Sequence, residues 1–170
     1  KKRRGLVDSE YNTRRQECER GASILGVRAL RDATLQQLQE HRDHMDPVTF
    51  RRCRHVVSEN ERTLAAVFAL RSGDLTHFGE LMNASHRSLR DDYEVSCAEL
   101  DAMVSAAWEQ PGTLGSRMTG AGFGGCTVSL VRSADTASFV QSVSASYTQA
   151  TGIVPEIYVC QAEDGVRVID

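Results

Sequence analysis

The chain has 170 residues, of which 41% are hydrophobic and 25% charged, and its formal net charge is −3. That length suits one ordinary domain, and the composition is typical of a soluble globular protein rather than a disordered or membrane-embedded one. The small negative charge argues against general nucleic-acid binding, and no apolar run reaches the ~18 residues that a membrane span needs.

The first two thirds of the sequence predict helices. Apolar residues recur at helical spacing between Glu10 and Leu25 and, more sparsely, between Thr34 and His44. Asp46-Pro47 then starts a long helix, because Asp can cap it and Pro at the first helical position loses no needed donor, and Gly73 ends it. The apolar residues of this helix trace one face: Phe50, Val57, Leu64, Val67 and Phe68.

Two further helices are predicted before the composition changes at Pro111-Gly112. Asp74 caps the first of them, whose apolar face runs from Phe78 to Leu89. A capping box at residues 96–99 opens the second, which carries apolar residues as far as Trp108.

The last third predicts strands around one helix. Residues 116–119 and Cys126–Val131 are typical of strands, the second being β-branched and alternating. A helix from Ser133 to Gly152 follows, and Val154–Cys160 and Val166–Ile169 are expected to form two final strands. Helices followed by a short antiparallel sheet predict an α+β fold, with residues 1–170 as one domain.

Between the first two predicted strands lie four glycines in six residues, Gly120-Ala121-Gly122-Phe123-Gly124-Gly125. Glycine permits positive φ and leaves backbone N–H groups unshielded, so such a loop can wrap an anion. The literal match to a dinucleotide fingerprint is weak, because a strand and not a helix follows. A Walker A loop is excluded, since lysine occurs only at positions 1 and 2. The alternative interpretation is a tight hairpin that uses glycine only for turning.

The residues around this loop carry a family resemblance. The run GSRMTGAGFGGCTV at residues 115–128 closely resembles the third characteristic motif of galactokinases, in the GHMP kinase superfamily. Residues 9–19, residues 51–59 (RRCRHVVSE) and residues 85–96 (SHRSLRDDYEVS) are similarly galactokinase-like and stand in the right order. The resemblance implies a GHMP kinase C-terminal domain, in which a helix-rich layer packs on a small antiparallel, ferredoxin-like sheet.

The resemblance also implies that a half is missing. The family's N-terminal strings for sugar and nucleotide, Gly-Arg-x-Asn, Gly-Glu-His-x-Asp and Gly-Leu-x-Ser-Ser-Ala, do not occur here. The whole enzyme transfers the γ-phosphoryl of ATP to the anomeric hydroxyl of D-galactose, chiefly by positioning and charge compensation. This half is expected to supply one wall of the sugar and phosphoryl site and to be inactive alone, with ATP and Mg held through the missing half.

Site residues follow from the same resemblance. Tyr11 matches the tyrosine that contacts galactose, and its ring can pack a sugar face while its hydroxyl makes a hydrogen bond. Arg3 matches a basic residue near the nucleotide phosphates. No catalytic residue and no metal ligand is expected in this segment. Four glycines are expected near the sugar and the transferred phosphoryl, where backbone dipoles would stabilise charge: Gly120, Gly122, Gly124 and Gly125.

Other chemistry-bearing residues favour structural roles. His41 and His44 lie on a polar helix and are typical of solvated surface rather than of a metal site. Asp91-Asp92 are interpreted as anchors of a helix end beside neighbouring arginines. Cys126 has no histidine near it in the motif and is interpreted as a small buried thiol in a strand. All five cysteines are scattered without a Cys-x-x-Cys pair, which predicts reduced thiols in a cytoplasmic protein.

Expected partners are D-galactose and ATP, with no nucleic acid and no membrane. Three alternatives stay open: a kinase for N-acetylgalactosamine or arabinose, a non-catalytic sensor of galactose and ATP, and a protein-interaction module. The family's sugar-choosing contacts lie mostly in the missing half, so this sequence discriminates poorly among the sugars. Without that half we expect exposed apolar side chains and open strand edges at residues 117–131, and therefore self-association.

Overall fold

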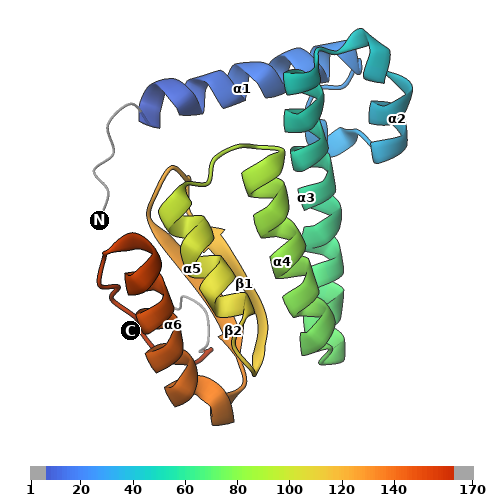
Figure 1. The fold of residues 1–170 in the computed structure, drawn as a ribbon. Coiled ribbons are helices and arrows are strands. Elements are labelled where there is room, and N and C mark those ends of the chain that lie inside the picture. The colour runs from blue at the N-terminus through green and yellow to red at the C-terminus, as the bar shows by residue number, and fades with distance from the viewer. Residues whose placement is uncertain (1–6, 163–170) are drawn as a thin grey trace, which may run out of the picture.

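A computed structural model describes residues 7–162 as a helix-rich α+β fold with a two-stranded antiparallel sheet (Figure 1). Short 3-10 turns lie at Leu30–Asp32, Arg42–His44 and Ser133–Asp135. The α+β class predicted from the sequence is confirmed. In chain order the elements are α1 (Val7–Ile24), α2 (Leu35–Glu40), α3 (Pro47–Ser72), α4 (Leu75–Asp91), α5 (Ala98–Trp108), β1 (Thr113–Thr119), β2 (Cys126–Val131) and α6 (Thr136–Thr151).

The capping signals in the sequence set most helix ends. Asp46 accepts hydrogen bonds at 3.0 Å from the backbone N–H groups of Val48 and Thr49, and α3 ends at Gly73, whose φ is 74°. The predicted capping box of α5 is wrong by one residue: Cys97 occupies the N-cap position, while the Ser96 hydroxyl donates to Asp101 at 2.5 Å. No helix within residues 7–162 is long and apolar enough to cross a membrane.

Helix α4 covers the outer edge of β1. At Gly79 the helix meets the backbone of Leu114 so closely that an added Cβ would overlap the Leu114 carbonyl. Farther along, the Asn83 Oδ1 accepts from the backbone N–H of Ser116 at 2.8 Å, and the His86 Nδ1 accepts from that of Met118 at 3.2 Å. Two helix side chains therefore take the place of a third strand, which satisfies edge donors that would otherwise be open.

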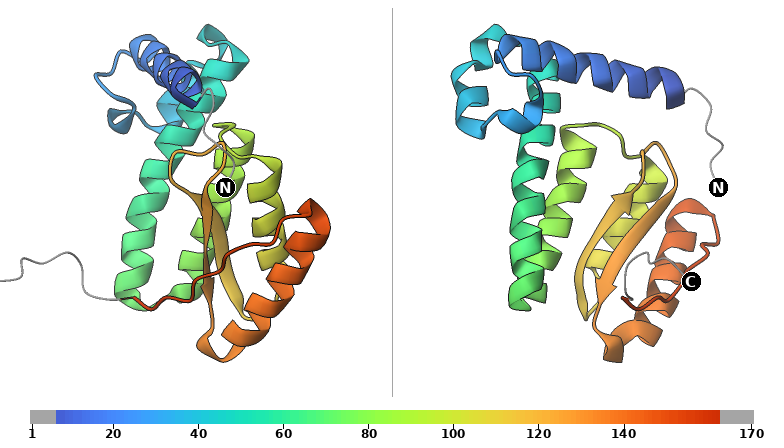
Figure 2. Two further views of the ribbon diagram at one scale, coloured as in Figure 1. Left: turned by 90° about the vertical axis from the view of Figure 1, so that its left-hand side faces the viewer. Right: turned by 180° about the vertical axis from the view of Figure 1, so that it is seen from behind.

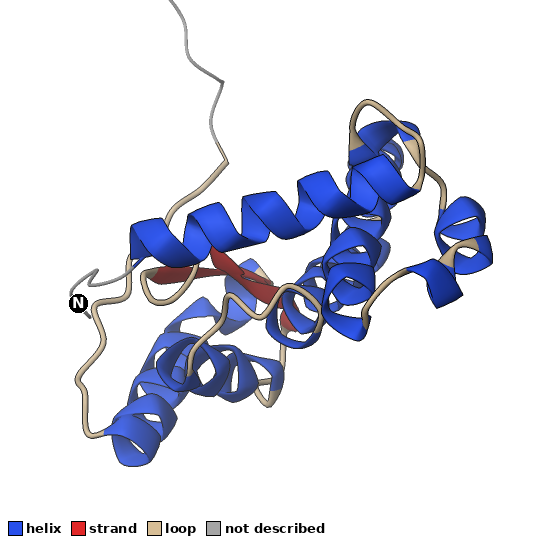
Figure 3. Cartoon of the chain, turned by 90° about the horizontal axis from the view of Figure 1, so that it is seen from above, coloured by secondary structure: helices blue, strands red, loops and turns tan. Residues whose placement is uncertain are grey.

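Helix α1 lies across one end of this assembly. It packs on the first half of α3 through a cluster that includes Ala22, Cys53 and Val57, and it passes over the strands (Figures 2 and 3). A second cluster joins α4, α5 and β1 through Leu89, Leu100 and Met118, and a third joins α5 to α6. The turn between β1 and β2 consequently lies beneath α1.

The apolar face predicted along α3 is buried over only half its length. Phe50 and Val57 belong to the core, whereas Leu64 and Phe68 are 73% and 74% exposed. Beyond Val57 the helix extends past α1 and α2 and packs on α4 (Figure 1). Helical periodicity shows that residues share a face, but it does not show where the partner ends.

The prediction of a strand at Val154–Cys160 is wrong. In the described part of the chain, no backbone hydrogen bond joins residues 154–162 to another strand, and Val154 and Tyr158 are largely exposed. Pro155 cannot donate to a ladder, which weakens any pairing of this segment. The strand predicted at Val166–Ile169 lies outside the described residues.

Candidate functional site

The glycine-rich turn between β1 and β2, residues 120–125, has an irregular left-handed backbone. The φ values are 84° at Gly120, 90° at Gly122, 131° at Gly124 and 121° at Gly125. Phe123 also has a positive φ of 58°, which is uncommon for a residue with a side chain. Gly120 and Gly125 are exposed whereas Gly122 is buried, so the loop presents one side to solvent and rests its other side on the protein.

The loop rests on residues 92–95, the first part of the connection between α4 and α5, which is called the 92–95 connection below. The Phe123 N–H donates to the Val95 carbonyl oxygen at 2.5 Å. At Gly122 an added Cβ would overlap the Val95 carbonyl oxygen and lie 2.7 Å from the Val95 Cβ. Glycine at this position is thus required by close packing as well as by its φ.

Buried arginines hold the 92–95 connection. The Asp92 carbonyl accepts from Arg52 Nη1 at 2.5 Å, while the carbonyls of Tyr93 and Glu94 accept from Arg14 Nε at 2.7 Å and Nη2 at 3.0 Å. Arg52 is 3% exposed and Arg14 is 7% exposed. Three successive carbonyl oxygens that helices cannot satisfy are thereby bonded to charged donors from α1 and α3.

Carboxylates compensate these buried charges. Glu17 accepts from Arg52 Nε at 3.0 Å and lies 3.7 Å from Arg14 Nη1. Glu94, whose φ is 53°, accepts from Arg52 at 2.6 Å and from Arg51 at 2.8 Å. The hydrogen bond from Arg52 is the main cause that keeps the pKa of Glu94 below its usual value.

Tyr11 lies on α1 and is 59% exposed. It precedes Arg14 by one helical turn, and the Arg14 guanidinium carbon lies 5.8 Å from the centre of the Phe123 ring. The structure therefore brings the helix that carries Tyr11 against the glycine loop and the 92–95 connection. Arg3, predicted as a phosphate contact, lies outside the described residues.

The sequence interpretation of two other sites is corrected in part. Asp91 pairs with Arg90 at 2.8 Å as expected, but Asp92 pairs with Arg54 of α3 and accepts from Ser88 at 3.2 Å. Cys126 is exposed rather than buried, because its place at the start of β2 lies on the open side of the hairpin. All five cysteines are free thiols.

Sequence reasoning missed the supporting residues Arg14, Arg52, Glu94 and Val95. They stand within the strings that carry the family resemblance, yet their pairings join residues up to 80 positions apart in the chain. A dense run of arginines facing an acidic turn was the available signal, but a sequence does not show which guanidinium reaches which carbonyl.

Two buried histidines stand behind the loop. The His55 ring stacks on Tyr93 with 4.4 Å between ring centres, and its Nδ1 lies 3.0 Å from the Ser88 Oγ. Burial lowers the pKa of His55 to about 4. Burial likewise lowers the pKa of His86, whose Nδ1 is occupied as an acceptor and whose Nε2 lies 3.3 Å from Asp101. Both rings are neutral near pH 7.

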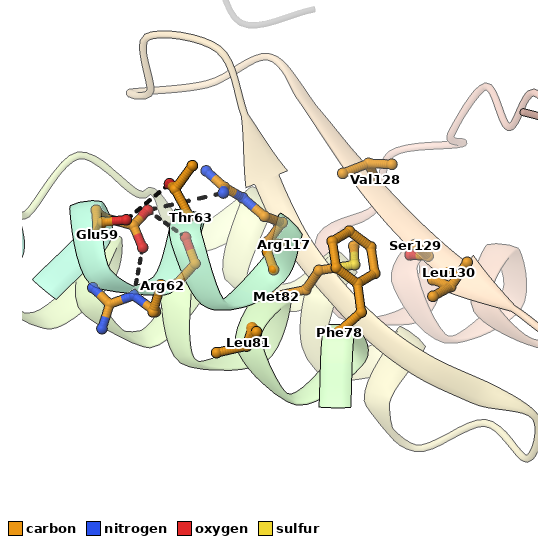
Figure 4. Close-up of a pocket in the computed structure, with 12 residues that line it drawn as sticks. Glu59, Arg62, Thr63, Phe78, Leu81, Met82, Arg117, Val128, Ser129 and Leu130 are labelled. Carbon is orange, nitrogen blue, oxygen red and sulfur yellow. Dashed lines mark hydrogen bonds and ion pairs between the residues drawn. The ribbon is translucent and has the colours of Figure 1, made fainter. Parts of the chain in front are cut away.

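A groove of about 290 Å³ separates α3 and α4 from the outer face of the hairpin (Figure 4). Its charged end holds Glu59, which accepts from Ser85 at 2.6 Å and from Arg62 at 2.5 Å, with Arg117 3.9 Å away. Its apolar end is lined by Phe78 and other side chains of α4 and β2. Glu59 is shared by Arg62 and Arg117, so the charged end of the groove carries one net positive charge.

The described residues form no magnesium site. Within residues 7–162 no three His, Cys, Asp or Glu side chains are grouped so that they could hold a metal ion. His41 and His44 lie with ring centres 6.0 Å apart at the protein surface.

Comparison with known proteins shows what this chain is similar to. Residues 66–147 match the family model of the GHMP kinases C terminal. Over 173 residues the chain is 50% identical to the galactokinase of Clostridium beijerinckii, covering 99% of this chain and 44% of that protein. It is 48% identical to the galactokinase of Bos taurus, covering 98% of this chain and 42% of that protein.

A solved structure agrees with the sequence comparison. The crystal structure of Lactococcus lactis galactokinase complexed with galactose matches with a TM-score of 0.85 and 40% identity. The match covers 90% of this chain and 41% of that one. The chain thus spans less than half the length of the relatives that it matches.

The buried histidines predict an acid-sensitive fold. Because the folded-state pKa of His55 is about 4, the unfolded chain takes up the proton first as the pH falls below about 6.5. The free energy of unfolding should therefore decrease by roughly 1.4 kcal/mol per pH unit from this residue between pH 6.5 and 4. Thermal unfolding across that range measures it.

A matched pair of variants tests this assignment. His55→Gln keeps a partner for Ser88 but cannot titrate, so its unfolding temperature should fall less steeply with acid than that of the wild type. His44→Gln, at an exposed position, should leave the slope unchanged. Equal slopes in His55→Gln and the wild type would contradict the assignment.

Proposed function

We propose that this chain is the C-terminal half of a galactokinase, in the GHMP kinase family, because residues 66–147 match the family model of the GHMP kinases C terminal and nearly the whole chain is similar to galactokinases. Such an enzyme transfers the γ-phosphoryl of ATP to the anomeric hydroxyl of D-galactose. In this proposal residues 1–170 form one domain of the enzyme, and they supply one wall of the site at which sugar and phosphoryl meet.

The observation that carries the proposal is the glycine loop together with the 92–95 connection and the buried arginines that support it. Gly120, Gly124 and Gly125 have positive φ values, and Gly120 and Gly125 are exposed. A simple hairpin turn has no need of three charged donors behind it, whereas a loop that presents N–H dipoles to a transferred phosphoryl must be held rigidly. Tyr11, exposed on the adjoining helix, is proposed to contact the galactose.

The nucleotide and its cation are assigned to the other half. The described residues do not fit a Mg site, so no step of the reaction is assigned here to the metal. ATP and Mg are proposed to be held by an N-terminal half, with Arg3 as a contact to the nucleotide phosphates. This chain's own contribution is then to position the sugar and to stabilise charge at the loop.

The proposal predicts that the chain alone has no phosphotransfer activity. A coupled assay of ADP release, with and without galactose, should show no galactose-dependent turnover for the purified 170-residue chain. The protein that joins it to a galactokinase N-terminal half should turn over. Clear activity of the homogeneous chain, or greater activity on N-acetylgalactosamine or arabinose than on galactose in the joined protein, would contradict the proposal.

Tyr11 offers a test of the sugar contact. In the joined protein Tyr11→Phe keeps the ring and removes one hydroxyl, so galactose binding should weaken by roughly 1–2 kcal/mol, seen mainly in KM. Tyr11→Ala should weaken it further. Tyr158→Phe, at another exposed tyrosine, is the control and should leave KM unchanged. An unchanged KM in both Tyr11 variants would refute this contact.

Self-association of the isolated chain is also proposed. Its apolar side chains Leu64, Phe68, Val154 and Tyr158 are each more than 70% exposed, and within residues 7–162 β2 pairs with β1 alone. Exposed patches and open edges favour contact with a second copy. Sedimentation over a concentration series should show a dimer that Leu64→Gln with Phe68→Gln weakens. A monomer at every concentration would rule this out.

A further inference from the structure

Arg14 contacts all three parts of the candidate site. It belongs to α1, the helix that carries Tyr11, and it donates to two carbonyl oxygens of the 92–95 connection, at 2.7 Å from Nε and 3.0 Å from Nη2. Its guanidinium carbon lies 5.8 Å from the centre of the Phe123 ring in the glycine loop. One side chain thus joins segments about 80 and 109 residues away in the chain.

The side chain is buried at this junction with its charge compensated. Arg14 is 7% exposed, and its Nη1 lies 3.5 Å from a Glu10 oxygen and 3.7 Å from a Glu17 oxygen. The guanidinium plane therefore presents one edge to α1's own carboxylates and the other to backbone carbonyls. This fork geometry cannot be reproduced by the single ammonium group of lysine.

Among residues 7–162, the two non-glycine residues with positive φ lie at the ends of this contact. Glu94 has a φ of 53°, and its carbonyl accepts from Arg14; Phe123 has a φ of 58°, and its ring lies beside Arg14. Unfavourable backbone conformations persist only where the surroundings hold them. Between these two residues the Val95 carbonyl accepts the Phe123 N–H, which links the connection to the loop.

From this geometry we propose that Arg14 is a positioning residue that sets the glycine loop in place relative to Tyr11. It touches neither sugar nor phosphoryl in this scheme; it acts through the 92–95 connection and through Phe123. The inference rests on the proposed function for its catalytic consequence, but the coupling of Arg14 to the loop is a property of the chain alone.

Arg15 is a matched control on the next position of the same helix. Its side chain is 70% exposed, and its hydrogen bond at 2.8 Å goes to Glu19, one turn along α1. Arg15→Lys and Arg15→Met make the same changes on the same helix at a side chain whose hydrogen bond goes to Glu19 and not to the 92–95 connection or the loop. The variants are Arg14→Lys, Arg14→Met, Arg15→Lys and Arg15→Met.

Hydrogen exchange of the unliganded chain tests the coupling directly. In Arg14→Lys the Phe123 N–H should exchange roughly tenfold faster than in the wild type, while amides in the middle of α3 and α5 keep their rates. Both Arg15 variants should match the wild type at Phe123. Wild-type exchange at Phe123 in Arg14→Lys, or an equal acceleration of all amides, would overturn the proposal.

Steady-state kinetics of the joined protein test the consequence. Arg14→Lys should lower kcat by roughly tenfold or more with KM for galactose nearly unchanged, because Tyr11 stays on its helix while the loop loses its place. A loss of kcat that only follows the folded fraction would overturn the positioning role. If the wild-type joined protein lacks galactokinase activity, the proposed function fails, and hydrogen exchange still decides the coupling. If Arg14→Met does not fold, hydrogen exchange and kinetics are both measured on Arg14→Lys.

Discussion

The structure depends on residues 92–95, the first part of the connection between α4 and α5, in which all four carbonyl oxygens accept hydrogen bonds. Between α4 and α5 the chain leaves helical geometry, and the carbonyls of Asp92, Tyr93 and Glu94 accept from buried arginines of α3 and α1. The fourth carbonyl, of Val95, accepts from the glycine loop. Because an unsatisfied buried carbonyl is costly, these bonds fix the connection, and the connection fixes the loop. Helix α1, remote in sequence, is held by the same bonds.

Helix side chains satisfy the edge of β1, where a larger sheet would have a further strand. The outer edge of β1 is bonded by Asn83 and His86 of α4, and the same Asn83 oxygen accepts from the Trp108 indole of α5 at 2.5 Å. The close approach at Gly79 makes this possible, since any side chain there would push α4 away from the strand. A short hairpin would be marginal by itself, and two polar side chains of α4 hold it in one register.

Local signals in the sequence predicted the helices and strands, whereas contacts between residues distant in the chain could not be predicted from it. Asp46-Pro47 and Gly73 mark α3 to the residue, because capping is decided by neighbours in the chain. The burial of Leu64 and the pairing of Val154–Cys160 depend on where partners lie, and both predictions were wrong. The glycine loop was identified by composition and resemblance. The support of this loop by Arg14 and Arg52 was not identified from the sequence, since pairings between distant residues leave no local pattern.

The strings that resemble galactokinases coincide with this support. Within residues 85–96, the side chain of His86 bonds β1, Tyr93 stacks on His55, and Glu94 pairs with two arginines of α3. Of the arginines in residues 51–54, each reaches that same stretch. A long run with a partner for nearly every residue admits few substitutions without leaving a buried charge or donor unpaired. The length of the resemblance is therefore explained by a network that holds the glycine loop.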